Sequence, residues 1–180
     1  MKKRRSAGNK QIPKFIKQYA DAWRVLDAYD KETLATKGST KKKIKLTAAG
    51  LADSVEKFGK YLAKKEEKGG MFGVERGGEI FEGIVGDVMQ SFNGKEVYST
   101  TEEKAANLFY FIVKDHPFVD GNKRSGAFAF VWFLDKAGIL DIKRIPPSTL
   151  TALTLLVAES DSKEKDKIIQ VILTLLVKNK

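Results

Sequence analysis

Apolar residues recur at spacings of three and four along most of this chain, and this helical period is the feature that most restricts its fold. The pattern predicts helices over residues 12–30, 46–70, 77–92, 100–116, 125–138, 145–160 and 161–179. Internal repeats are absent from the sequence. The expected fold is therefore a single, mostly helical domain with one small hairpin.

Several of these helices carry recognisable start or stop signals. Thr100 and Glu103 predict a capping box, which places the start of the fourth helix at residue 100. Pro147 is expected in the first turn of the sixth helix, and the glycine pair at 69–70 is expected to end the second. Two residues are candidates for the cap of the last helix, Asp161 and Ser162.

Three helices differ in how their apolar residues are arranged. The first is expected to be amphipathic, with one apolar stripe formed by Ile12, Phe15, Ile16, Tyr19, Trp23, Leu26 and Tyr29. The third places Ile80, Ile84 and Val88 in phase, although its glycines weaken the definition of its ends. The fifth, residues 125–138, is apolar on nearly every side, so it is expected to run through the core.

The strongest hairpin signal lies between the third and fourth helices. Asn93 and Gly94 stand between Phe92 and the Val97–Tyr98 pair. Asn-Gly is the preferred pair for a tight two-residue hairpin turn because both residues tolerate positive φ. Residues 91–100 are therefore predicted to contain a small β-hairpin.

The composition restricts the class of protein further. The chain has 180 residues, of which 42% are hydrophobic, so it can bury a sizeable core. It has no cysteine, which excludes disulfides, thiolate metal sites and cysteine nucleophiles. The longest apolar run, Ala127 to Leu134, is too short to cross a bilayer. We expect a soluble cytoplasmic protein that does not act at a membrane.

The net charge of +10 is concentrated in two segments that contain no acidic residue. They contribute nine positive charges, from Lys2, Lys3, Arg4, Arg5, Lys37, Lys41, Lys42, Lys43 and Lys45. Such segments can contact nucleic-acid phosphates, but the chain shows no basic helix face and no aromatic platform. A solvated tail and a solvated linker are the favoured interpretation, and nucleic acid is not an expected partner.

The stretch "KDHPFVDGNKRSGAFAF", residues 114–130, carries the candidate chemistry. It contains the only histidine, His116, at the end of an apolar helix face. A glycine turn that opens the next helix directs backbone N–H groups and the positive end of the helix dipole toward one point, which suits phosphates. Further donors and positive charge come from the first turn of that helix, at Asn122, Lys123 and Arg124.

The acidic residue of this stretch, Asp120, is placed to bind Mg²⁺ that bridges to a phosphate. His116 is placed to take a proton from an attacking hydroxyl group. Together these groups describe transfer from a nucleotide to a hydroxyl. Each residue has a structural explanation when taken alone, but their combination between two apolar helices favours function. Phe118 is different, because we expect it to fill the core and hold the loop.

The sequence "HPFVDGNKR", residues 116–124, resembles the signature H-P-F-x-[DE]-G-N-[GK]-R of the Fic/Doc (Fido) family at every defined position. The resemblance is strong over about residues 75–137 and looser before them. It implies an all-α, helical-bundle fold with a β-hairpin flap. It divides the chain into an N-terminal helix and basic linker, residues 1–46, and a catalytic domain, residues 47–180, within one compact unit.

The resemblance also implies site residues. The catalytic residues would be His116 as general base, Asp120 as the Mg²⁺ ligand, and Arg124. The phosphates of ATP would be held by Gly121, Asn122, Lys123 and Arg124. The flap that docks a target protein by strand pairing would be formed by Phe92, Asn93, Gly94 and Lys95.

Two positions resemble the Doc branch, which works as a protein kinase. Lys123 stands where many AMP-transferring members have glycine, and Ala127 stands where they have a second arginine. Gly121 departs from the alanine that is common in Doc-type motifs. The inhibitory pattern [ST]-x-x-x-E-[GN] occurs only as near misses, at Ser99 with Glu103 and at Ser160 with Glu164. Restraint by a separate antitoxin protein therefore remains open.

The leading hypothesis is a transferase that moves AMP or phosphate from ATP, with Mg²⁺, to a Ser, Thr or Tyr hydroxyl of a target protein. It would be an AMPylating nucleotidyltransferase or a Doc-type kinase, and a toxin–antitoxin role is compatible with either. A catalytically idle Fic scaffold that binds protein or nucleic acid is the main alternative. A DNA-binding protein is the third, and it predicts strongly salt-dependent DNA affinity.

Overall fold

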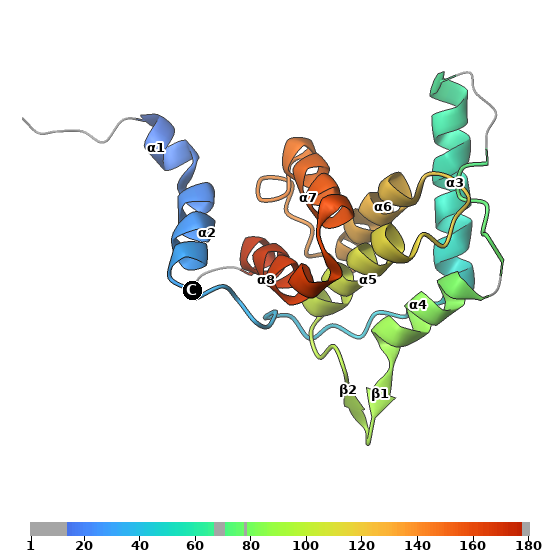
Figure 1. Cartoon of the computed structure of the whole chain (residues 1–180), viewed down its shortest axis with the longest axis horizontal. Helices are drawn as coiled ribbons and strands as arrows, with labels where there is room; N and C mark the ends of the chain where they lie inside the picture. Colours follow the sequence, from blue (N-terminus) through green and yellow to red (C-terminus); the bar gives the residue numbers. More distant parts are fainter. Residues whose placement is uncertain (1–13, 67–70, 78, 178–180) are drawn as a thin grey trace, which may run out of the picture.

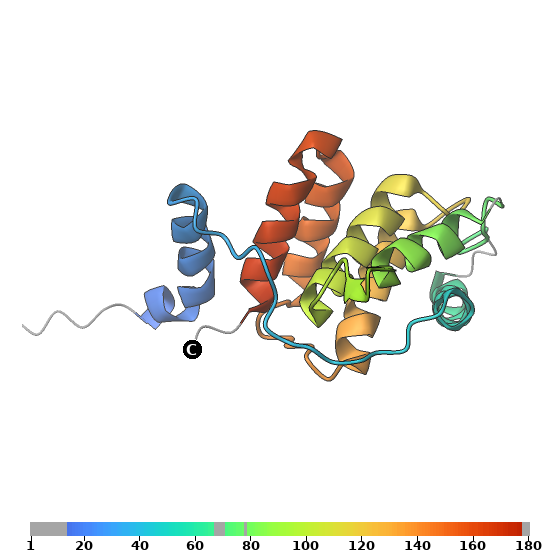
Figure 2. The same cartoon turned by 90° about the horizontal axis from the view of Figure 1, so that it is seen from below.

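The computed structural model describes residues 14–66, 71–77 and 79–177. Within them the fold is all-α apart from one two-stranded hairpin, as the sequence predicts. Helices α5 and α6 lie side by side at the centre, α7 and α8 cover one side, α3 and α4 lie on the other, and α1 and α2 lie beyond α8 (Figures 1 and 2). The helices are α1 (Lys14–Gln18), α2 (Ala20–Asp30), α3 (Ala48–Glu66), α4 (Ile80–Met89), α5 (Thr101–Asp115), α6 (Asn122–Lys136), α7 (Pro147–Glu159) and α8 (Lys165–Leu176).

The core is formed mainly by α5 and α6, since both are apolar on most of their circumference. Phe109 of α5 and Phe130 of α6 are fully buried and stack with ring centroids 5.1 Å apart. The two helices approach each other closely at Gly126, where an added Cβ would lie 2.6 Å from Cγ2 of Val113. The sequence prediction that this helix runs through the core is confirmed.

The close approach at Gly126 gives the first testable prediction. Gly126→Ala is expected to destabilise the protein by about 1–3 kcal/mol, because the methyl group overpacks the α5–α6 contact. Gly86→Ala on α4 is the matched control, since no atom lies within 4 Å of its added Cβ. That control should stabilise the protein by about 0.5–1 kcal/mol. Urea unfolding measures the change in the free energy of unfolding, which should have opposite signs in the two variants.

The single helix predicted over residues 12–30 is wrong in one respect, because the structure divides it into α1 and α2 at Tyr19. At the break, the indole Nε1 of Trp23 donates to the carbonyl oxygen of Ile16 at 3.0 Å. Arg24 anchors α2 to α8 by donating to the carbonyl oxygen of Thr174 at 2.7 Å. The predicted apolar stripe therefore faces away from the core. Its described members are all exposed, namely Ile16, Tyr19, Trp23, Leu26 and Tyr29.

Most predicted helix ends agree with the structure. The capping box of Thr100 and Glu103 forms, Pro147 begins α7, and Asp161 caps the 3₁₀ turn Ser162–Glu164 that leads into α8. Two helices are exceptions, because the third spans Ile80–Met89 and not residues 77–92, and the fifth begins at Asn122 and not at Ser125. The predicted start at Ile12, the glycine pair 69–70 and the basic tail at residues 2–5 lie outside the described residues.

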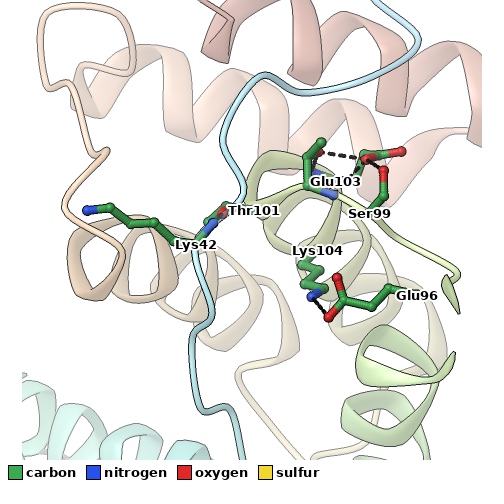
Figure 3. A network of polar contacts seen from close by, with 7 residues as sticks. Lys42, Glu96, Ser99, Thr101, Glu103 and Lys104 are labelled. Carbon is green, nitrogen blue, oxygen red and sulfur yellow. Dashed lines mark hydrogen bonds and ion pairs between the residues drawn. The ribbon is translucent and has the colours of Figure 1, made fainter. Parts of the chain in front are cut away.

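The predicted linker is irregular in structure, but it is held against the helices. It runs from α2 to α3 beneath the central helices (Figure 2). The carboxylate of Glu102, at the start of α5, accepts hydrogen bonds from the backbone N–H and the hydroxyl of Thr40, the latter at 2.8 Å. Lys42, drawn in Figure 3, donates from Nζ to the carbonyl oxygen of Ala137 at 2.6 Å, at the C-terminal end of α6. A cation is favourable at this position because the C-terminal end of a helix is the negative end of its dipole.

The predicted hairpin also forms. Strands β1 (Ser91–Phe92) and β2 (Lys95–Glu96) pair antiparallel through a turn in which Asn93 and Gly94 both have positive φ. None of the described helices is both long and apolar enough to cross a membrane.

Candidate functional site

The candidate general base lies at the C-terminal end of α5. His116 follows Asp115, the last helical residue, and has φ 49° and ψ 56°, in the left-handed region. This conformation is uncommon for a residue other than glycine, and it turns the chain away from the helix axis. The side chain of His116 is exposed. The structure thus leaves the only imidazole of the chain accessible at the point where the apolar helix ends.

Charged groups lie beside this histidine. Partial burial raises the pKa of Asp115, and the nearby Lys165 opposes that shift. Partial burial also lowers the pKa of Lys165, whose Nζ lies 4.1 Å from the ring centroid of Phe111. Asp115 and Lys165 therefore interact as opposite charges beside the end of α5.

The loop after His116 is fixed by Asn122. Its Oδ1 accepts a hydrogen bond from the backbone N–H of Phe118, and its Nδ2 donates to the carbonyl oxygen of the same residue, both at 2.8 Å. Phe118 is buried and packs against Phe81 with ring centroids 5.1 Å apart, as its predicted structural role requires. The side chain of Asn122 is therefore used to hold the loop, and its contribution to a phosphate site is its backbone N–H.

Asn122→Ala is expected to destabilise the protein by about 1–3 kcal/mol, because it leaves the buried N–H of Phe118 without its side-chain partner and removes one of the donors to the carbonyl oxygen of Phe118, which Arg76 also contacts. Asn122→Asp is the matched variant, since it keeps the acceptor for the N–H of Phe118 but replaces the donor to the carbonyl. In thermal unfolding, the melting temperature should be highest for the wild type, lower for Asn122→Asp and lowest for Asn122→Ala. If both variants melted at the wild-type temperature, the side chain of Asn122 would not be what holds the loop.

A segment before α4, residues 71–76, runs beside the loop that joins α5 to α6, residues 116–121, which we call the motif loop. Its backbone pairs with the loop through Gly73 N–H to Asp120 O at 3.2 Å and Val119 N–H to Val74 O at 2.8 Å. Arg76 adds a backbone hydrogen bond to Pro117 and a side-chain hydrogen bond from Nε to the carbonyl oxygen of Phe118 at 2.9 Å. We call residues 71–76 the strap. It holds the loop from outside, while Asn122 holds it from inside.

The start of α6 contains the residues predicted to hold phosphates, and we call residues 121–124 the cradle. Gly121 is the N-cap, with φ 81° and ψ 16°, and Asn122, Lys123 and Arg124 form the first turn. The first N–H groups of a helix have no carbonyl partner within that helix, and they lie at the positive end of its dipole. The structure therefore brings His116, Asp120 and the residues from Gly121 to Arg124 together on one short loop and the helix that follows it.

Asp120 and Arg124 contact each other at the mouth of this cradle. Oδ1 of Asp120 accepts from the backbone N–H of Gly121 at 2.6 Å, and its Oδ2 lies 3.5 Å from Nη2 of Arg124. The guanidinium of Arg124 also lies 4.8 Å from the ring centroid of Phe72, a residue of the strap. Both charged side chains are roughly half exposed, so they are accessible to a ligand.

A single exposed carboxylate fits Mg²⁺ in the way that nucleotide-binding enzymes use it, with one protein ligand and the remaining oxygens from phosphates and water. The described residues contain no cluster of three or more His, Cys, Asp or Glu side chains that could hold a metal by themselves. Asp120 alone would thus suit an ion whose other ligands come from water or from a bound anion.

A mostly apolar cavity of about 200 Å³ adjoins the cradle between α6 and α7. Lys123 and Arg124 line both the cavity and the cradle. Ala127 lines it too, so both Doc-like positions, Lys123 and Ala127, face this space. Its remaining lining comes from α7, namely Leu150, Thr151, Thr154 and Leu155.

The structure does not bring the predicted flap to the motif. The hairpin directly precedes the N-terminus of α5, whereas His116 lies beyond its C-terminus, about 22 Å away along a helix of 15 residues. Figure 1 shows the hairpin and the motif loop at different ends of the central helices. Exposed residues form the tip of the hairpin, namely Phe92, Asn93, Gly94 and Lys95. The hairpin is tied to α5 by Lys104, whose Nζ lies 2.7 Å from Oε1 of Glu96 (Figure 3).

The two near misses to the inhibitory pattern are used in capping. Glu103 accepts from the backbone N–H and hydroxyl of Thr100, and from the hydroxyl of Ser99, at the start of α5 (Figure 3). Glu164 accepts from the backbone N–H of Asp161 before α8. Both glutamates therefore serve helix starts.

Sequence reasoning missed the strap. Phe72 and Arg76 were not selected because "MFGVER" has neither a helical nor an alternating pattern. One signal was present, since the segment lies between glycine pairs at 69–70 and 77–78. Glycine pairs on both sides of a short apolar segment favour sharp turns of the chain before and after it.

The fold and the site define a helical protein in which a short fixed loop joins an exposed histidine to the start of a central helix. The chain belongs to the Fic/DOC family, whose model matches residues 39–134 and therefore slightly more than half of the 180 residues. No curated protein matches the chain, and no solved structure matches it.

Proposed function

We propose that the protein transfers AMP or a phosphoryl group from ATP to a Ser, Thr or Tyr hydroxyl of a target protein. One observation supports this most directly. The loop that joins His116 to the first turn of α6 is fixed by Asn122 on one side and by the strap on the other. A base and an anion cradle that keep a fixed separation meet the main requirement of phosphoryl transfer, which is positioning. The family generally transfers nucleotidyl or phosphoryl groups to proteins.

The proposed roles follow from the geometry. His116 removes the proton of the acceptor hydroxyl, whose oxygen then forms a bond to a phosphorus atom of ATP. Attack at the α-phosphorus breaks the bond to pyrophosphate and leaves AMP on the target, whereas attack at the γ-phosphorus releases ADP. Backbone N–H groups from Gly121 to Arg124, with the Lys123 and Arg124 side chains, hold the phosphates. Asp120 holds Mg²⁺, which would neutralise phosphate charge when bound.

The apolar cavity beside the cradle suits the nucleoside part of ATP, because it shares Lys123 and Arg124 with the phosphate site. The Doc-like positions Lys123 and Ala127 both line it, and this inclines the proposal toward phosphoryl transfer. The strap is a better candidate than the hairpin for meeting the acceptor protein, since it already pairs with the motif loop. An antitoxin protein remains a proposed partner, because the two candidate inhibitory glutamates are used elsewhere.

The test uses purified protein, Mg²⁺ and cell lysate, with ATP labelled at either the α- or the γ-phosphate. Protein label from γ-labelled ATP alone supports the phosphoryl form of the proposal, and label from α-labelled ATP supports AMP transfer. Absence of label from both, together with absence of Mg²⁺-dependent ATP binding by calorimetry, would favour the idle scaffold. DNA affinity that falls steeply with salt would favour the third hypothesis.

A further inference from the structure

Phe72 contacts two of the residues assigned to the phosphate cradle. The ring lies against Gly121, where an added Cβ would come within 2.4 Å of Cδ2 and Cε2 of Phe72. The same ring lies under the guanidinium of Arg124, 4.8 Å from its centroid. A cation at this distance from an aromatic face is attracted by the quadrupole of the ring. One strap residue therefore touches both the turn that opens α6 and the side chain that carries its charge.

The ring itself is held in place. Phe58 of α3 meets it edge to face with centroids 5.6 Å apart, and Phe128 of α6 stacks on Phe58 at 4.6 Å. The backbone on either side of the ring is tied to the motif loop, since the N–H of Gly73 donates to Asp120 O. Because the strap and the loop are joined by backbone hydrogen bonds, the ring and the cradle keep a fixed relation.

The second contact of Arg124 is of a different kind. Its ion pair with Asp120, at 3.5 Å between Nη2 and Oδ2, uses the carboxylate that the proposed function assigns to Mg²⁺. A metal ion on that carboxylate would compete with the guanidinium. The contact with the Phe72 ring involves no atom of Asp120. It can therefore persist whether the carboxylate binds a metal ion or pairs with Arg124. Removing the ring would return rotamer freedom to the guanidinium, and phosphate binding would again have to remove that freedom.

We propose that Phe72 is a positioning residue that holds the guanidinium of Arg124 ready for the phosphates of ATP. The inference rests on the proposed function, because it concerns the same cradle. It predicts that the aromatic face matters, and not merely the apolar volume. Tyr or Trp at position 72 keeps that face, whereas Leu removes it.

The experiment measures the dissociation constant of ATP in the presence of Mg²⁺ by calorimetry. Phe72→Leu is expected to raise it by roughly two- to thirty-fold, while Phe72→Tyr and Phe72→Trp stay within about twofold of the wild type. Phe128→Leu is the matched control, since it removes a ring of the same cluster that stacks on Phe58. Equal weakening by Phe72→Leu and Phe128→Leu would mean that the cluster is merely structural and would overturn the proposal.

A double-mutant cycle separates positioning from other effects. In an Arg124→Ala background, Phe72→Leu should have no further effect on ATP affinity, because no guanidinium remains to be positioned. If Phe72→Leu weakens binding by the same factor with and without Arg124, the ring acts in another way and the proposal fails.

A readout without nucleotide distinguishes failure of this inference from failure of the proposed function. In the free protein, the ring current of Phe72 should move the side-chain N–H proton resonances of Arg124 upfield, and Phe72→Leu should remove the shift. An upfield shift in a protein that does not bind ATP would leave the ring–guanidinium contact intact and refute the nucleotide role. Absence of the shift in the wild type would refute the contact itself.

Discussion

His116→Asn is expected to lower transfer of label to the target protein by about 10²–10⁴-fold, the usual contribution of a general base. Asparagine is the informative replacement because it tolerates the left-handed backbone that His116 adopts, at φ 49°. Its amide cannot accept a proton at neutral pH. The exposed position of His116 means that no packing is lost. The variant should therefore unfold at the wild-type temperature and bind ATP with wild-type affinity, so that the loss is confined to the chemical step.

The matched control for this variant is Asp115→Asn, one residue earlier in the chain. It removes an exposed carboxylate at the end of α5 but leaves the imidazole, and it should keep transfer within a few-fold of the wild type. Single-turnover labelling at saturating ATP measures both variants. A His116→Asn protein that kept a tenth or more of wild-type transfer would show that another group accepts the proton.

The motif loop could be predicted from the sequence because its information is local. Thr100, Glu103 and the apolar face of α5 define where that helix starts and ends, so the position of His116 followed from the helix period. Gly121 likewise marked the turn that opens α6. In both cases the residues that determine the geometry lie within about 20 positions of each other, and short-range rules are sufficient.

The strap and the hairpin show where such rules stop. The Asn93–Gly94 turn predicted the hairpin correctly, but a turn signal says nothing about where the hairpin lies relative to His116. The strap pairs with a loop more than 40 residues later, between Gly73 and Asp120, and backbone pairing leaves little trace in side-chain patterns. The helical spacing of apolar residues predicted the apolar stripe of α2. That spacing does not reveal whether another element covers the stripe.

Gly121→Ala is expected to destabilise the protein by about 2–4 kcal/mol, for two reasons that can be separated. The backbone φ of 81° is strained for any residue with a Cβ, and the new methyl group would overlap the ring of Phe72, 2.4 Å away. Gly94→Ala in the hairpin turn isolates the first reason, since its φ is 73° and nothing lies within 4 Å of its added Cβ. That control should cost only about 1–2 kcal/mol, measured by urea unfolding.

Gly121→Ala should also weaken ATP binding, by roughly tenfold or more, because the ring of Phe72 can avoid the new methyl group only by moving away from Arg124. Removing the ring as well, in Gly121→Ala with Phe72→Ala, should recover the overlap cost but not the ATP affinity. Alanine is common at this position in Doc-type motifs, so the comparison tests whether Phe72 is what excludes it here. Equal destabilisation by Gly121→Ala and Gly94→Ala would mean that the ring yields freely, and the strap would then not fix the cradle.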